Sequence, residues 1–121
     1  MYNENELVRI KSINKKLDNI NTIITRHNGI VKALEDIEGQ PALLMLLVAI
    51  AEQFSKLQKS NAVVLNEFSN IDLKGIVSVR NFIAHDYDGV NFSVIEDGLR
   101  YEVPKLYKIT NDIVGNNSNK L

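Results

Sequence analysis

Apolar residues recur at intervals of three and four along most of this 121-residue chain, and that spacing restricts the folds it can adopt. Over residues 4–28 the apolar positions are Ile10, Ile13, Leu17, Ile20 and Ile24. Intervals of three and four place such residues in one stripe along a helix. No stretch alternates apolar and polar residues as a half-buried strand would. The pattern therefore predicts an all-α fold.

The same spacing predicts four more helices after the first. We expect them over residues 30–38, 41–59, 72–85 and 91–115, with a short helical turn at 63–68. The helix over 41–59 is apolar almost all round, which is typical of a helix at the centre of a bundle or in an interface. The expected architecture is an up-and-down bundle of four to five helices.

Glycine and proline refine the expected boundaries. Gly39 is expected to end the second helix, and Pro41 fits the first turn of the third, where its missing N–H costs nothing. Pro104 lies inside the last apolar stripe, so we expect a kink near residues 99–104.

The length of the chain fits a single domain. Gly115 is expected to end the last helix, which gives one helical domain over residues 1–115. Residues 116–121 are polar apart from the last and are expected to form a disordered tail.

The charge balance limits the partners of such a domain. With 14 basic and 15 acidic residues the net charge is −1, which argues against a broad nucleic-acid surface but permits a small RNA site with local positive charge. There is no cysteine, so disulfides and thiolate metal sites are excluded.

The sequence also predicts where the protein resides. The N-terminus lacks the basic-then-apolar pattern of a signal peptide. The most apolar run, residues 42–51, is ten residues long and too short to span a bilayer. We therefore expect a cytoplasmic protein with no membrane partner.

The side chains best suited to catalysis or ligand binding lie within residues 80–87. Arg80, His85 and Tyr87 fall within eight residues at the end of a predicted helix. Arginine offers a planar cationic fork for phosphate, and histidine can donate or accept a proton near neutral pH. These residue types suggest that the site acts on a phosphodiester or a nucleotide. Basic residues also cap ordinary helix ends, and a tyrosine beside a turn can simply pack, so residue types alone leave both interpretations open.

The spacing of Arg80 and His85 raises a geometric difficulty. Five residues turn through about 140° on an ideal helix, so the two side chains do not lie one above the other. They can converge if the helix ends near Ala84, if the long arginine side chain swings round, or if a second chain supplies the missing half. This difficulty favours a dimer.

Other polar residues are weaker candidates. Glu52 is out of place in the apolar helix, where it marks the edge of the bundle or supports the site. Asn81 could orient Arg80 or a phosphate, or be an ordinary exposed residue. Asp86 is given no role beyond raising local acidity, and His27 is expected to cap the first helix. Histidines and carboxylates show no metal-ligand spacing, and there is no glycine-rich phosphate loop, so neither metal nor cofactor is expected.

The string R-x4-H-x-Y, within RNFIAHDYDGV and followed by VPKL, resembles the signature of the HEPN superfamily. More narrowly, it resembles HepT-like toxins that are paired with minimal nucleotidyltransferase antitoxins. The resemblance covers roughly residues 40–110. Glu52 matches the glutamate of the Gly-Glu-Ala that such sequences tend to carry, although its neighbours Ala51 and Gln53 differ. The Pro-Trp common near the start of the motif helix is replaced by Asp72-Leu73.

This resemblance implies a specific function. It implies a HEPN-like homodimer that acts as a metal-independent endoribonuclease toxin, with Arg80 and His85 as catalytic residues near the two-fold axis. It also implies an antitoxin of the minimal nucleotidyltransferase type, which neutralises the toxin by transferring AMP to Tyr87. Two alternatives remain: a non-catalytic HEPN partner of a nucleotidyltransferase that binds a nucleotide or phosphate, and a purely structural helical dimer.

Overall fold

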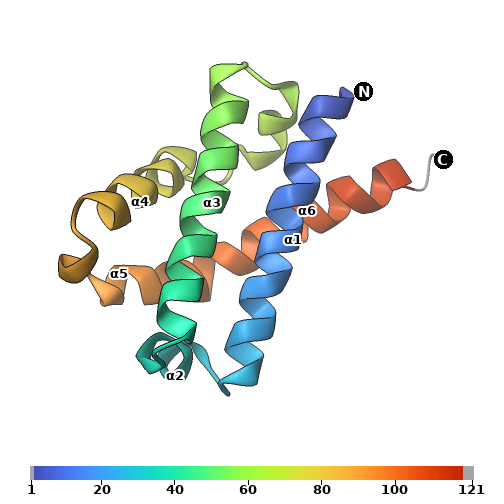
Figure 1. Cartoon of the computed structure of the whole chain (residues 1–121). Coiled ribbons are helices and arrows are strands. Elements are labelled where there is room, and N and C mark those ends of the chain that lie inside the picture. Colours follow the sequence, from blue (N-terminus) through green and yellow to red (C-terminus); the bar gives the residue numbers. More distant parts are fainter. Residues whose placement is uncertain (1, 119–121) are drawn as a thin grey trace.

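A computed structural model describes residues 2–118 of the chain, and all of its regular structure within that range is helical (Figure 1). The α-helices are α1 (Glu4–Arg26), α2 (Ile30–Glu35), α3 (Gly39–Lys59), α4 (Leu73–His85), α5 (Phe92–Asp97) and α6 (Val103–Ser118). A 3-10 turn, η1 (Val63–Phe68), joins α3 to α4, and a second, η2 (Tyr87–Gly89), joins α4 to α5. A π-helical segment, η3 (Gly98–Glu102), joins α5 to α6. The all-α prediction is confirmed.

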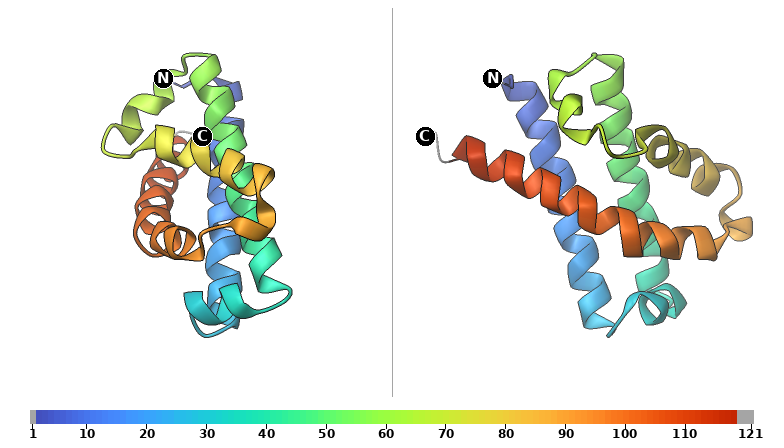
Figure 2. Two further views of the ribbon diagram at one scale, coloured as in Figure 1. Left: turned by 90° about the vertical axis from the view of Figure 1, so that its left-hand side faces the viewer. Right: turned by 180° about the vertical axis from the view of Figure 1, so that it is seen from behind.

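The helices α1 and α3 run antiparallel side by side, and α6 crosses them on one face (Figures 1 and 2). The predicted stripe of α1 points into the core, where Ile10, Ile13, Leu17 and Ile20 are fully buried. On α3, Phe54 packs edge-to-face against Phe68, with ring centroids 5.1 Å apart. The apolar residues of α1 and α3 therefore form the centre of the bundle, as predicted.

The first turn of the chain departs from the predicted boundaries by two residues. The helix α1 ends at Arg26, because Asn28 and Gly29 adopt positive φ angles of 62° and 140°. Both residue types tolerate this left-handed region, and it ends a helix.

Gly39 begins α3 rather than ending α2, which corrects the sequence prediction. The carboxylate of Asp36 accepts the backbone N–H groups of Glu38 and Gly39, at 2.9 and 2.8 Å, and so holds the start of α3. The N–H of Gly39, followed by that of Glu38, lowers the pKa of Asp36. A Cβ atom at position 39 would lie 2.5 Å from the carbonyl oxygen of Ala33, so glycine is needed for this close approach of α2 to α3.

The last predicted helix is interrupted where Pro104 predicted a kink. The residues before it form η3, in which the N–H of Val103 donates to the carbonyl of Gly98, five residues earlier. Such π segments are a common cause of irregularity inside helices. Gly115 does not end α6, because its φ is not positive and the helix continues to Ser118. The predicted helix end at Gly115 is therefore wrong, and residues 119–121 of the predicted tail lie outside the described residues.

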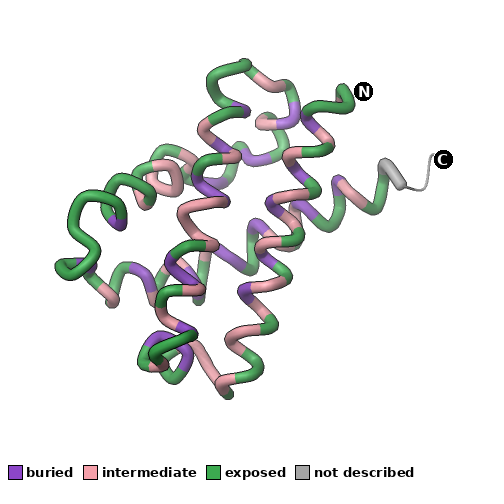
Figure 3. The backbone as a smooth tube through the Cα atoms, in the orientation of Figure 1, coloured by how far each residue is buried: buried purple, intermediate pink, exposed green. Residues whose placement is uncertain are grey.

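The helix α4 is the least covered long helix within the described part of the chain. Ile83 is its one buried residue, although α4 packs along α3 near its start. Its far end projects from the bundle, and exposed residues dominate it (Figures 1 and 3). The predicted motif lies at this projecting end.

Candidate active site

The three residues of the predicted motif all face solvent. Arg80 lies on α4 with 53% of its side chain exposed, and His85 is the last residue of α4 and is also exposed. Tyr87 begins η2, directly after the helix, and is 45% exposed. A tyrosine that served only to fill the core would be buried, so the exposure of Tyr87 favours a role at the surface.

Arg80 is tied to α3 by Glu52, the candidate that the sequence placed at the edge of the bundle. The Nε atom of Arg80 lies 3.6 Å from Oε1 of Glu52. The two Nη atoms of Arg80 form the outer edge of the guanidinium and have no partner among the described residues. This outer edge can bind a phosphate with two hydrogen bonds. The contact with Glu52 therefore leaves the outer edge of the Arg80 guanidinium accessible.

His85 does not meet Arg80 within one chain. The helix α4 continues through His85, so the convergence that would follow from a helix end at Ala84 does not occur. The contact with Glu52 also draws Arg80 toward α3. Two of the three predicted routes to convergence, a helix end at Ala84 and an arginine side chain turned toward His85, are therefore absent from the single chain.

Two residues next to the motif, Asp86 and Asn81, differ in the contacts that they make. The side chain of Asp86 accepts the N–H of Gly89 at 3.1 Å and so holds the turn that carries Tyr87. This role of Asp86 was not predicted from the sequence, although an aspartate three residues before a glycine is a common turn signal. Asn81 is exposed, and its side chain forms no hydrogen bond with Arg80.

The second histidine, His27, has a structural role at the end of α1, as predicted. His27 is the C-cap of α1, with Nδ1 2.8 Å from the carbonyl oxygen of Ile23 and Nε2 3.2 Å from the carboxylate of Asp36. It lies at the α1–α2 turn, away from the projecting end of α4 (Figure 1). His85 is therefore the histidine of the candidate site.

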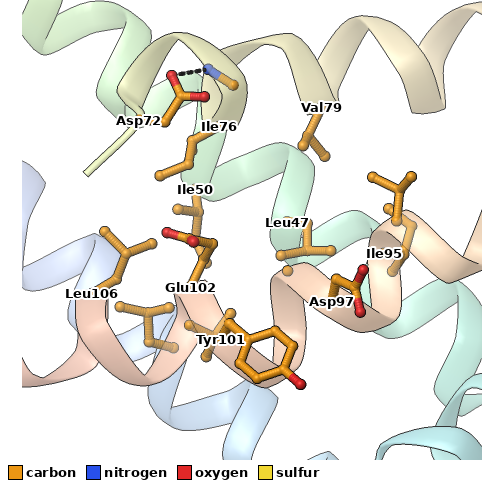
Figure 4. Close-up of a pocket in the computed structure, with 15 residues that line it drawn as sticks. Leu47, Ile50, Asp72, Ile76, Val79, Ile95, Asp97, Tyr101, Glu102 and Leu106 are labelled. Carbon is orange, nitrogen blue, oxygen red and sulfur yellow. Dashed lines mark hydrogen bonds between the residues drawn. The ribbon is translucent and has the colours of Figure 1, made fainter. Parts of the chain in front are cut away.

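An apolar groove runs along the side of α4 that faces α5, η3 and α6 (Figure 4). Its cavity volume is about 300 Å³. The floor is apolar and includes Leu47, Ile50, Ile76, Val79 and Leu106. The rim carries Asp72, Asp97, Tyr101 and Glu102. Exposed apolar side chains beside the groove are Phe82, Val94 and Tyr101.

Within residues 2–118, no group of three histidine, aspartate or glutamate side chains is arranged to hold a metal ion. In the same range, no helix combines the length and the apolar character needed to cross a membrane.

The fold and the site together define a class: small all-α domains that present arginine, histidine and tyrosine at one exposed helix end. Residues 13–113 match the family model described as "Ribonuclease HepT-like", and the chain belongs to this HepT-like ribonuclease family. The resemblance inferred from the motif is confirmed. The chain is also 27% identical over 111 residues to "Putative RNase MJ0127" of Methanocaldococcus jannaschii, a match that covers 87% of this chain and 89% of the relative. No solved structure matches the chain.

Proposed function

We propose that this protein is a metal-independent endoribonuclease toxin. The observation that carries the proposal is the arrangement at the end of α4: Arg80 is held by Glu52 with its outer edge free, and the exposed His85 follows about 1.4 turns later. Membership of a ribonuclease family supports this interpretation of the residues.

The proposed reaction uses the RNA's own 2′-hydroxyl as the nucleophile. Its oxygen attacks the adjacent phosphorus, the bond from phosphorus to the 5′-oxygen breaks, and the products carry a 2′,3′-cyclic phosphate and a 5′-hydroxyl. Arg80 stabilises the negative charge that develops on the phosphate oxygens. His85 transfers a proton as general acid or base, a role that contributes on the order of 10²–10⁴ in rate.

A homodimer supplies the arrangement that one chain lacks. A second copy can place its His85 near the Arg80 that Glu52 draws away from the His85 of the same chain. The groove beside α4 provides an apolar surface for that contact, because Phe82, Val94 and Tyr101 next to it are each more than half exposed. Exposed apolar patches of this kind mark interaction surfaces.

Tyr87 is the proposed point of control. The partner would be a minimal nucleotidyltransferase antitoxin that transfers AMP to the tyrosine hydroxyl, with pyrophosphate as the leaving group if ATP is the donor. The ring is accessible, and Asp86 fixes the turn that carries it. The added phosphodiester would place negative charge beside Arg80 and His85, where it competes with RNA for the cations.

The bond that is broken can be tested directly. Purified protein is expected to cleave an RNA and to leave 2′,3′-cyclic phosphate ends, because the 2′-oxygen is the nucleophile. The same RNA with a 2′-O-methyl group at the cleaved nucleotide is expected to resist. Mass analysis of the product ends measures the outcome. Cleavage of the methylated position would contradict the proposed chemistry, and binding without cleavage of either RNA would favour a phosphate-binding partner instead.

Glu52 is expected to act as a positioning residue for Arg80. Glu52→Ala should lower kcat/KM for RNA about tenfold, within the range of coupling free energies between contacting residues. Both side chains are about half exposed, so the variant should unfold at the same temperature as the parent. The readout is a double-mutant cycle: Glu52→Ala should have little further effect in an Arg80→Lys background, which lacks the Nε contact.

Glu67→Ala is a suitable control, because Glu67 binds the hydroxyl of Tyr2 at 2.7 Å, away from α4. If Glu52→Ala caused the same loss in the parent protein and in the Arg80→Lys background, Glu52 would not act through Arg80.

A further inference from the structure

The face of α3 that carries Glu52 also carries two lysines toward the end of the helix. Lys56 and Lys59 follow Glu52 at intervals of four and three, and both are exposed. Neither side chain has an ion-pair or hydrogen-bond partner among the described residues. We refer to the surface formed by Glu52, Lys56 and Lys59 as the α3 lysine face.

Helix geometry places these lysines in line with Arg80. Four residues rotate 40° past a full turn and seven fall 20° short of two turns, so Lys56 and Lys59 share the face of Glu52. Their backbones lie about 6 Å and about 10.5 Å further along the axis of α3. Because Glu52 contacts Arg80 at 3.6 Å, the guanidinium lies at the start of this row of cations. The helix α3 lies between α1 and α4 (Figure 1), and the row runs along α3 toward its C-terminal end at Lys59.

The groove beside α4, α5 and η3 carries acidic side chains at its rim. These are Asp72, Asp97 and Glu102 (Figure 4), of which Glu102 pairs with Lys105 at 3.8 Å. Carboxylates repel a phosphate backbone, whereas lysines attract it. Of the groove and the α3 lysine face, the α3 lysine face is therefore the surface whose charge favours an RNA strand that leaves Arg80.

The α3 lysine face suits contacts to the backbone rather than to bases. The aromatic residue of α3, Phe54, is fully buried, so no ring from this helix is available for base stacking. Lysine binds phosphate as a point charge and does not distinguish sequences. A strand bound here would be held irrespective of its sequence.

We infer that Lys56 and Lys59 bind the phosphates of single-stranded RNA beside the phosphate held by Arg80, so that the α3 lysine face forms the path of the substrate strand. This inference rests on the proposed function, because it assigns the strand whose phosphate Arg80 holds. It differs from a role in stabilising α3, for which lysines near the C-terminus of a helix are also suited.

The test measures binding of fluorescent 2′-O-methyl RNA, which the proposed chemistry cannot cleave. Lys56→Ala/Lys59→Ala is expected to bind a long single strand about tenfold more weakly at low salt and to reduce the slope of log K against log salt by about 1.4, since each phosphate contact contributes about 0.7. Affinity for a dinucleotide should stay unchanged, because it reaches only Arg80. The control Lys32→Ala/Lys108→Ala removes the same charge from exposed sites on α2 and α6.

An unchanged salt slope in the Lys56/Lys59 variant, or an equal loss in the control, would overturn the inference. Undetectable binding of the long strand by the parent protein would also overturn it. Melting temperatures of both variants separate a loss of contact from a loss of fold. The proposed function fails independently, if the parent protein binds RNA through these lysines but leaves cleavable RNA intact.

Discussion

His85→Ala is expected to lower the rate of RNA cleavage by a factor on the order of 10²–10⁴, the usual contribution of a positioned general acid or base. The side chain is exposed at the end of α4 and has no hydrogen-bond partner among the described residues. Its loss should therefore leave the unfolding temperature and RNA affinity nearly unchanged. Single-turnover cleavage kinetics with excess enzyme measure the chemical step apart from binding.

The other histidine provides the matched control. His27→Gln removes the contact with Asp36 at the α1–α2 turn and is expected to affect stability while leaving the cleavage rate of the folded protein intact. A His85→Ala variant that cleaves RNA at the parent rate would remove His85 from the mechanism.

Tyr87→Phe is expected to be toxic even when the nucleotidyltransferase partner is present. The change removes one hydroxyl from an exposed ring, so the fold and the cleavage rate should stay the same. The partner would lose the atom that accepts AMP, and the negative charge beside Arg80 and His85 would not be added. Growth on co-expression with the partner measures neutralisation, and intact-protein mass measures the transfer of AMP.

Tyr101→Phe is the control for this experiment, since Tyr101 is also exposed but lies on η3 rather than beside the motif. The control should gain AMP and be neutralised like the parent. Neutralisation of Tyr87→Phe by the partner would show that modification of this tyrosine is not the means of control.

The spacing of apolar residues in the sequence was sufficient to predict the helices and the stripe of residues that each one buries. Ile10, Ile13 and Leu17 lie in the core because a spacing of three and four has one structural solution on a helix. The ends of the helices were harder to predict, because they depend on contacts that the spacing of apolar residues does not reveal. Gly39 begins α3 since its backbone approaches Ala33 closely, which no pattern within residues 30–41 predicts.

The candidate site follows from the sequence in its residue types but not in its geometry. Arg80, His85 and Tyr87 were found because they lie close together in the sequence. The contact between Arg80 and Glu52 depends on how α4 packs on α3, and the sequence alone gave Glu52 only as a supporting candidate. Lys56 and Lys59 became candidates for RNA binding only after that contact placed Arg80 beside their face of α3.

The most direct test of the central claim is cleavage of RNA by purified, unmodified protein in excess EDTA, with intact mass showing that Tyr87 carries no AMP. Our account predicts cleavage that is independent of chelator and added divalent cation, because Arg80 and His85 supply the charge stabilisation and the proton transfer. Cleavage that stops in EDTA and returns with a divalent cation would contradict it, as would intact tRNA, rRNA and mRNA after incubation with the folded protein.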